Sequence, residues 1–248
     1  MAVNDREAAF NSWAPPPGPW RIVYWVTFGL LCAAVVGLIV GFFMTFRAAR
    51  VPSSSMAPAI QAGDLVNYQR GASGIVRGDV VMLQVPGIGL VVKRVIGLTG
   101  DRVTCCDSAG RVAVDGKALA EDYLPPGVAP SQVTFAVTLG SGQVWVMGDN
   151  RTISLDSRSW GPLAMSDIAG RVIQVYRPGG RTLLRTPATF TADGLAPADH
   201  RIPLPFLLLG LALLAILAVI VQGTVGIIMW VVRRRRRKLR QQPQQMAW

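Results

Sequence analysis

The segment Val51–Ile60 reads Val-Pro-Ser-Ser-Ser-Met-Ala-Pro-Ala-Ile, and the rest of the chain is arranged around it. Each proline fixes its own φ and favours an extended conformation for the residue before it. The three serines are therefore expected on stiff, extended backbone, where a hydroxyl can act as a nucleophile if a base is near. A Ser/Pro-rich linker has the same composition, because both residues are common in loops. The remainder of the chain decides between these two interpretations.

The chain has two apolar runs without a charged residue, at 22–46 before the serine segment and at 204–232 near the C-terminus. They account for much of the 51% hydrophobic composition. Each exceeds the roughly 20 residues that an α-helix needs to cross a bilayer. The first run is longer than the apolar core of a cleaved signal peptide, and a polar tail precedes it, so an uncleaved anchor is predicted. The predicted parts are a cytoplasmic tail 1–21, a transmembrane helix 22–46, an extracytoplasmic domain 47–203, a transmembrane helix 204–232 and a basic cytoplasmic tail 233–248.

The distribution of charge predicts the orientation in the membrane. Seven of the positive charges lie in the stretch 233–240, whereas residues 47–203 carry sixteen Lys or Arg and twelve Asp or Glu. The middle domain is therefore not a strongly basic nucleic-acid-binding module. Positive residues beside a span favour the cytoplasmic side, which places both termini inside and the middle domain outside. Binding of the tail to anionic lipid or to RNA is the alternative.

Short runs rich in β-branched residues, separated by glycine-containing turns, dominate the middle domain. This pattern predicts a mainly β domain built on an antiparallel sheet, with no convincing helix. Residues 178–203 are interpreted as a connector to the second span. The predicted turns and strands are 61–68, 77–85, 90–97, 111–119, 143–147 and 171–176.

The three cysteines do not predict a metal site. Cys32 lies in the first apolar run, where packing is its expected role, and Cys105 and Cys106 are adjacent in the middle domain. Without a nearby histidine, metal binding by this pair is disfavoured. A disulfide between neighbours in an oxidising compartment and two free thiols are both compatible with the sequence. No metal and no cofactor is predicted.

A serine nucleophile needs a proton acceptor, and the chain offers few candidates. The single histidine, His200, lies just before the second apolar run, far along the chain from the serines. Of the three lysines, Lys238 is in the basic tail and Lys117 follows an Asp-Gly turn, whereas Lys93 stands in a run of valines and isoleucine. Serine–lysine pairs are an established alternative to the serine–histidine arrangement.

Lys93 has the residue type and surroundings that a general base requires. If its side chain is buried, desolvation disfavours the ammonium form and lowers the pKa toward the neutral range. Arginine is not an alternative base, because it does not deprotonate in proteins. An outward-facing lysine that protects a strand edge is the competing interpretation, and the residue alternation does not choose between the faces.

The polar segment 148–161 is expected to orient this amine. Ser154, Asp156 and Arg158 alternate, so they share a face if the backbone is extended. A hydroxyl on that face can hold a neutral lysine, while a carboxylate–guanidinium pair fixes the loop. A plain surface loop is the alternative.

With these residues assembled, the chain resembles bacterial type I signal peptidases. Three blocks carry the resemblance in order: Pro-Ser-x-Ser-Met-x-Pro at 52–58, Lys-Arg-Val-x-Gly-x-x-Gly-Asp at 93–101, and Gly-Asp-Asn-Arg-x-x-Ser-x-Asp-Ser-Arg-x-x-Gly at 148–161. A weaker block, Arg-Gly-Asp-Val-Val, lies at 77–81. The resemblance implies a mostly β catalytic domain set against the membrane surface.

The resemblance also implies roles for individual residues. Ser55 is the expected nucleophile and Lys93 its general base, while the Ser53 hydroxyl and the Ser55 backbone N–H form the oxyanion hole. Pro52 and Met56 are expected to bind substrate. The supporting residues implied by the third block are Ser154, which hydrogen-bonds the lysine, and Asp149, Asp156 and Arg158, which hold the site together.

The implied activity is removal of signal peptides from secreted preproteins after small residues of the Ala-x-Ala type, at the bacterial plasma membrane. The implied partners are these preproteins, the lipid bilayer and the protein-export machinery, and no nucleic acid. Another serine–lysine protease, such as a self-cleaving repressor relative or a maturation peptidase of a pilus or conjugation system, is one alternative. A non-catalytic, membrane-tethered β-domain adaptor is another.

Overall fold

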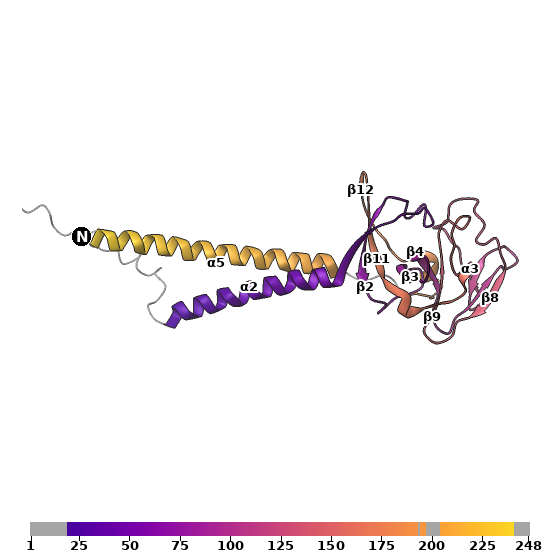
Figure 1. Cartoon of the computed structure of the whole chain (residues 1–248), viewed down its shortest axis with the longest axis horizontal. Helices are drawn as coiled ribbons and strands as arrows, with labels where there is room; N and C mark the ends of the chain where they lie inside the picture. The colour runs from indigo at the N-terminus through magenta and orange to yellow at the C-terminus, as the bar shows by residue number, and fades with distance from the viewer. Residues whose placement is uncertain (1–18, 193, 197–203, 241–248) are drawn as a thin grey trace, which may run out of the picture. The chain divides into compact units, whose positions relative to one another are not determined.

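The computed structural model describes residues 19–192, 194–196 and 204–240. The chain forms two compact units, one made of residues 1–43 and 204–248 and the other of residues 44–203. Residues 1–18 and 241–248 of the predicted tails lie outside the described residues, as does His200. Figure 1 shows the two long helices and the strands of the second unit.

The first unit contains α2 (Pro19–Thr45) and α5 (Leu204–Arg240). Both are long and apolar enough to cross a membrane, over Ile22–Thr45 and Leu207–Val232. The helix α5 continues eight residues beyond the predicted end of the span at 232, because arginine and lysine are good helix formers. Polar contacts join the two helices: the Gln222 side-chain amide donates to Thr27 Oγ1 over 3.1 Å.

The second unit confirms the predicted mainly β, antiparallel architecture. One sheet has eight strands in the order β1-β2-β11-β3-β4-β9-β10, with β12 paired to β11, and a second has four in the order β7-β6-β5-β8. The strands are β1 (Phe46–Arg50), β2 (Leu65–Arg70), β3 (Val80–Val85), β4 (Gly89–Gly97), β5 (Arg102–Cys105), β6 (Val112–Val114), β7 (Lys117–Ala118), β8 (Phe135–Thr138), β9 (Gln143–Met147), β10 (Leu163–Ala164), β11 (Ile168–Arg177) and β12 (Gly180–Leu183).

The structure corrects the prediction for residues 178–203. Where a connector was expected, β12 extends the large sheet and α4 (Ala188–Ala192) forms a short helix. Phe190 is fully buried, and Leu195 and Ala196 are 7% exposed in the same core cluster. The expectation of no helix was also wrong for α3 (Ser157–Trp160). Helices of four or five residues give no periodic apolar pattern, which is why the sequence did not reveal them.

The central strand pair β3 and β4 is covered on both faces. Five of the six residues of β3 and the last six of β4 are buried. Successive side chains on a strand point to opposite faces, so Lys93 and Arg94 enter different sides of the interior. Both residues are only 3% exposed. The outward-facing alternative for Lys93 therefore does not apply.

Candidate active site

Ser55 and Lys93 meet although 38 residues separate them in the sequence. The Lys93 Nζ donates a hydrogen bond of 2.9 Å to Ser55 Oγ. Lys93 is held on β4 opposite Val81 of β3, and its Nζ lies 6.0 Å from the ring centroid of Trp160. The arrangement puts a buried amine in direct contact with the hydroxyl of a half-buried serine.

Burial lowers the pKa of Lys93 to about 8 from its usual 10.5. The carboxylates of Asp156 and Asp149 oppose this shift, because each favours the positively charged ammonium, whereas the Arg158 guanidinium reinforces it. Desolvation is the largest of these effects. A substantial fraction of the amine is then neutral at mildly alkaline pH, as proton acceptance requires.

The serine segment is not extended throughout, which corrects the prediction for Ser55. Residues 51–54 have no regular structure, but Ser55 begins a turn. The turn is closed by backbone hydrogen bonds from Ala57 N–H to the Ser54 carbonyl and from Ile60 N–H to the Met56 carbonyl, which outweigh the local preference for extension. The Ser53 hydroxyl donates to Ser55 Oγ over 3.3 Å, so two hydroxyls of the segment lie together.

The two residues expected to bind substrate differ in exposure. Pro52 is exposed, whereas Met56 is fully buried in the core cluster that also contains Val51 and Ile60. Met56 thus anchors the serine segment to the β-unit by packing. A role of either residue in substrate binding stays a prediction.

The loop that follows β9 is attached directly to the serine segment. The Asn150 backbone N–H donates to the Ser55 carbonyl over 3.0 Å. Gly148 lies so close that a Cβ there would stand 2.5 Å from the Ser55 carbonyl oxygen and closer still to Ser154 Oγ. Only glycine fits this approach, so the loop positions Ser55 through its backbone.

Asp156 and Arg158 form the predicted carboxylate–guanidinium pair, but on a different backbone from the one expected. Asp156 is the N-cap of α3, and its carboxylate accepts from the backbone N–H groups of Arg158 and Gly148. The Arg158 Nε and Nη2 each donate to this carboxylate over 2.8 Å. Arg158 is thus helical, since capping of the helix N-terminus by Asp156 outweighs the extended alternative. Burial is the largest effect on Asp156 and raises its pKa, but the hydrogen bonds that the carboxylate accepts, above all from Arg158, lower the pKa overall.

Ser154 lies against the loop backbone and Asp156. Its Oγ donates a long hydrogen bond of 3.5 Å to the Leu155 carbonyl, and a hydrogen bond to Asp156 helps to lower the pKa of that carboxyl. Ser154 is 8% exposed. The hydrogen bond from Ser154 to Lys93 that the resemblance implied stays a prediction.

Asp149 forms an ion pair with Arg94, the residue that follows Lys93 on β4. The Arg94 Nε donates to Asp149 Oδ1 over 2.8 Å and Nη2 to Oδ2 over 2.5 Å, with both side chains almost fully buried. Arg94 also lies over the ring of Tyr123, 4.3 Å from its centroid. Sequence reasoning gave Arg94 no role, although its place beside the candidate base was a usable signal.

A second buried ion pair was also missed. Arg151 pairs with Glu121, and their side chains are 0% and 3% exposed. Arg151 Nε donates to the Gly148 carbonyl over 3.0 Å, so this pair holds the backbone at the start of the loop that carries Asn150. Glu121 gave no sequence signal because it lies in a loop of the small sheet, 30 residues away.

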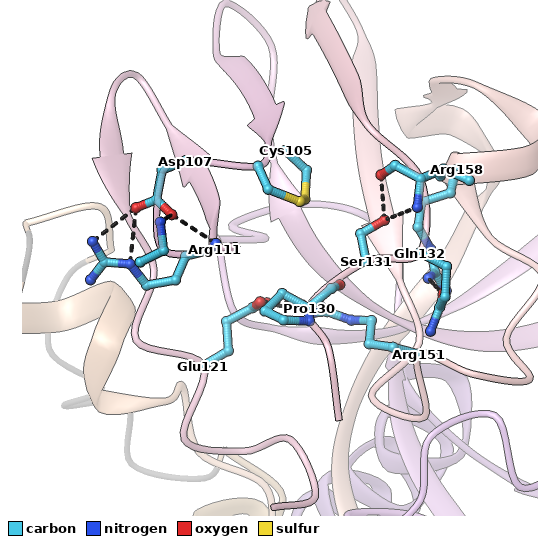
Figure 2. The surroundings of a disulfide bond; sticks show 12 residues. Cys105, Asp107, Arg111, Glu121, Pro130, Ser131, Gln132, Arg151 and Arg158 are labelled. Carbon is cyan, nitrogen blue, oxygen red and sulfur yellow. Dashed lines mark hydrogen bonds and ion pairs between the residues drawn. A yellow bond between two sulfur atoms is a disulfide. The ribbon is translucent and has the colours of Figure 1, made fainter. Parts of the chain in front are cut away.

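Cys105 and Cys106 are joined by a disulfide, one of the two states that the sequence left open. Cys105 ends β5 and pairs with Phe135, the first residue of β8. Figure 2 shows this disulfide in the same region as Ser131, Gln132 and Arg158. Among the described residues, no group of three or more His, Cys, Asp or Glu side chains is placed to hold a metal ion.

Comparisons with known proteins show which family the chain belongs to. Residues 22–177 match the profile described as signal peptidase, peptidase S26. The chain is similar to a probable signal peptidase I-1 of Synechocystis, with 34% identity over 68% of this chain and 89% of the relative. It is similar to signal peptidase I V of Bacillus subtilis, with 33% identity over 49% of this chain and 80% of the relative.

A solved structure of a signal peptidase I from Enterococcus faecalis is 28% identical and covers 40% of this chain and 97% of the solved one, with a TM-score of 0.35. The profile match spans more than half of the chain, and the Synechocystis relative is aligned over most of its own length. The chain therefore belongs to the signal peptidase family, peptidase S26, and is a serine endopeptidase of that family.

Proposed function

We propose that this protein removes N-terminal signal peptides from secreted preproteins, with Ser55 as nucleophile and Lys93 as general base. The contact of 2.9 Å between Lys93 Nζ and Ser55 Oγ carries the proposal, because it joins a hydroxyl to a buried amine of lowered pKa. The relatives named signal peptidases supply the substrate class. Cleavage after small residues of the Ala-x-Ala type follows from the same family resemblance.

The proposed reaction proceeds through an acyl-enzyme. Neutral Lys93 takes the proton of Ser55 Oγ as that oxygen attacks the scissile carbonyl carbon, and the carbonyl oxygen becomes an oxyanion. The Ser55 backbone N–H and the Ser53 hydroxyl, already beside Ser55 Oγ, stabilise this charge. The C–N bond then breaks, the lysine ammonium protonates the leaving amine, and neutral Lys93 later activates the water that hydrolyses the ester.

The membrane arrangement is part of the proposal. The two apolar helices span the bilayer, and the arginine-rich end of α5 stays in the cytoplasm, as the preference of positive residues for that side favours. The β-unit is then outside the cytoplasm, where a disulfide can persist. There it meets preproteins at the bacterial plasma membrane as the export machinery delivers them.

Two substitutions in the full-length chain test the dyad, using a model precursor in detergent micelles. Ser55→Ala removes the nucleophile and Lys93→Arg replaces the base by a group that stays protonated, so both variants should lose cleavage while remaining folded. Ser54→Ala and Lys117→Arg are the matched controls and should cleave like the unchanged protein. Cleavage at the normal rate by either dyad variant would contradict the mechanism.

A maturation peptidase of a pilus or conjugation system would use the same dyad on another substrate, and a β-domain adaptor would use none. A serine-directed acylating probe separates the adaptor from both peptidases, because only a reactive Ser55 becomes labelled. Competition between a secretory precursor and a pilin-type precursor then identifies the preferred substrate. The names of the relatives favour the secretory precursor.

A further inference from the structure

The segment 121–132 joins two strands of the small sheet and contacts the loop that carries the third motif. We call this segment the strap; it follows β7 and leads into β8. At its beginning, Arg151 Nη1 donates to Glu121 Oε2 over 2.9 Å, and near its end the same Nη1 donates to the Pro130 carbonyl. Figure 2 shows Glu121 and Pro130 beside Arg151. The strap is therefore fixed to the loop after β9 at two points.

A third point joins the strap to Arg158. The Arg158 Nη1 donates to Gln132 Oε1 over 2.8 Å, while its Nη2 also donates to the Ser154 carbonyl over 3.2 Å. With the two bonds to Asp156, every nitrogen of the guanidinium has an acceptor. The Arg158 side chain is 6% exposed. Gln132 is exposed, and it supplies the acceptor for Nη1 from the strap.

The position of Arg158 matters electrostatically for Lys93. Asp156 and Asp149 favour the charged form of Lys93, and Arg158 disfavours it. Asp149 is already neutralised by Arg94, and Asp156 by Arg158. A guanidinium that leaves its place would expose Lys93 to the Asp156 carboxylate and favour the ammonium form.

We propose that Gln132 is a positioning residue for the Ser55–Lys93 dyad, because it fixes the guanidinium of Arg158 against Asp156 and so keeps Lys93 ready to accept a proton. This inference rests on the proposed peptidase function. It adds to it a residue outside the three motifs, in the connection between β7 and β8. Gln132 acts through Arg158, to which it is hydrogen-bonded.

Three variants of the full-length chain in detergent test this role with the model precursor. Gln132→Ala should lower kcat about fivefold, since a hydrogen bond of this kind contributes on the order of 1 kcal/mol. It should also move the midpoint of the pH–rate profile upward. Gln132→Glu keeps an acceptor for Nη1 but adds a negative charge, so kcat at high pH should be retained while the midpoint rises by a few tenths of a unit, on the order of 0.3. Exposed Thr134→Ala is the matched control and should change neither quantity.

The pKa of Lys93 gives a readout that does not depend on activity. Selective 13C labelling of lysine produces signals from only three residues, Lys93, Lys117 and Lys238. The titration of the Lys93 Cε should shift upward in both Gln132 variants and stay unchanged in Thr134→Ala. Unchanged kcat and unchanged Lys93 titration in Gln132→Ala would overturn the positioning role. An unchanged protein that cleaves no precursor would instead overturn the peptidase function.

Discussion

Lys93 and Arg94 are consecutive residues of β4, yet they serve two separate buried sites. Lys93 donates to Ser55 Oγ on one side of the sheet, and Arg94 is held by Asp149 on the other. A strand buried on both faces makes this possible, because neighbouring side chains point in opposite directions. The strand β4 therefore carries both the candidate base and the arginine whose ion pair with Asp149 fixes the loop after β9.

Activity should rise with pH through the pKa of Lys93, at about 8. Lys93 acts as a base only when neutral, so kcat/KM falls as the ammonium form accumulates below that pH. A pH–rate profile with the model precursor, between pH 6 and 10, measures this. Activity that is highest near pH 6 and declines toward pH 9 would contradict the assignment of Lys93 as base.

Replacing Lys93 by methionine should stabilise the protein at neutral pH. The pKa is lower in the folded chain than in the unfolded chain, so the unfolded state binds more protons between pH 8 and 10.5 and stability rises with pH across that window. Below pH 8 the buried ammonium therefore costs roughly 3 kcal/mol, at 1.36 kcal/mol per pKa unit. Thermal unfolding of Lys93→Met at pH 7 and pH 10 tests this: the gain in Tm should be large at pH 7 and smaller at pH 10. Equal gains at both pH values would rule out the proton linkage.

Breaking the Arg94–Asp149 pair should strongly destabilise the β-unit. Asp149→Ala removes the carboxylate that pairs with the Arg94 guanidinium and leaves this charge buried, which typically costs about 3–5 kcal/mol. Denaturant unfolding measures the loss. Arg111→Ala, which breaks a solvent-exposed ion pair with Asp107, is the control and should change stability little. Similar losses in the two variants would show that burial of the pair does not matter.

Gly148→Ala should reduce kcat/KM by about a hundredfold or more. The added methyl group collides with the Ser55 carbonyl and with Ser154, so the loop or the serine segment must shift, and displacements near 1 Å are enough for losses of this size. Gly140→Ala, where the new Cβ would approach no closer than 3.3 Å to Gln143, is the control. Hydrolysis of the model precursor gives the comparison, and a fully active Gly148→Ala would show that the contact is not needed.

Much of the β-unit followed from local pattern. The alternating or fully apolar runs at β3, β4, β9 and β11 were recognisable, as was the turn between β6 and β7. The strand β1 was not predicted, because its sequence Phe-Arg-Ala-Ala-Arg has little apolar character and pairs only at the sheet edge with β2. The short helix after Asp156 was missed for a related reason: its stability comes from one capping side chain rather than from a periodic face.

The sequence by itself determined which residues have the chemistry for the site: a serine between prolines, and one lysine among β-branched residues where no histidine was well placed. It also determined the two apolar helices, because their length and composition are local properties. Only the tertiary structure decided that Lys93 faces inward, that Asp149 belongs to Arg94, and that Glu121 and Gln132 of the strap hold Arg151 and Arg158. These contacts join residues far apart in the chain, and the face of a strand and the partner of a charge are fixed only when the sheets pack.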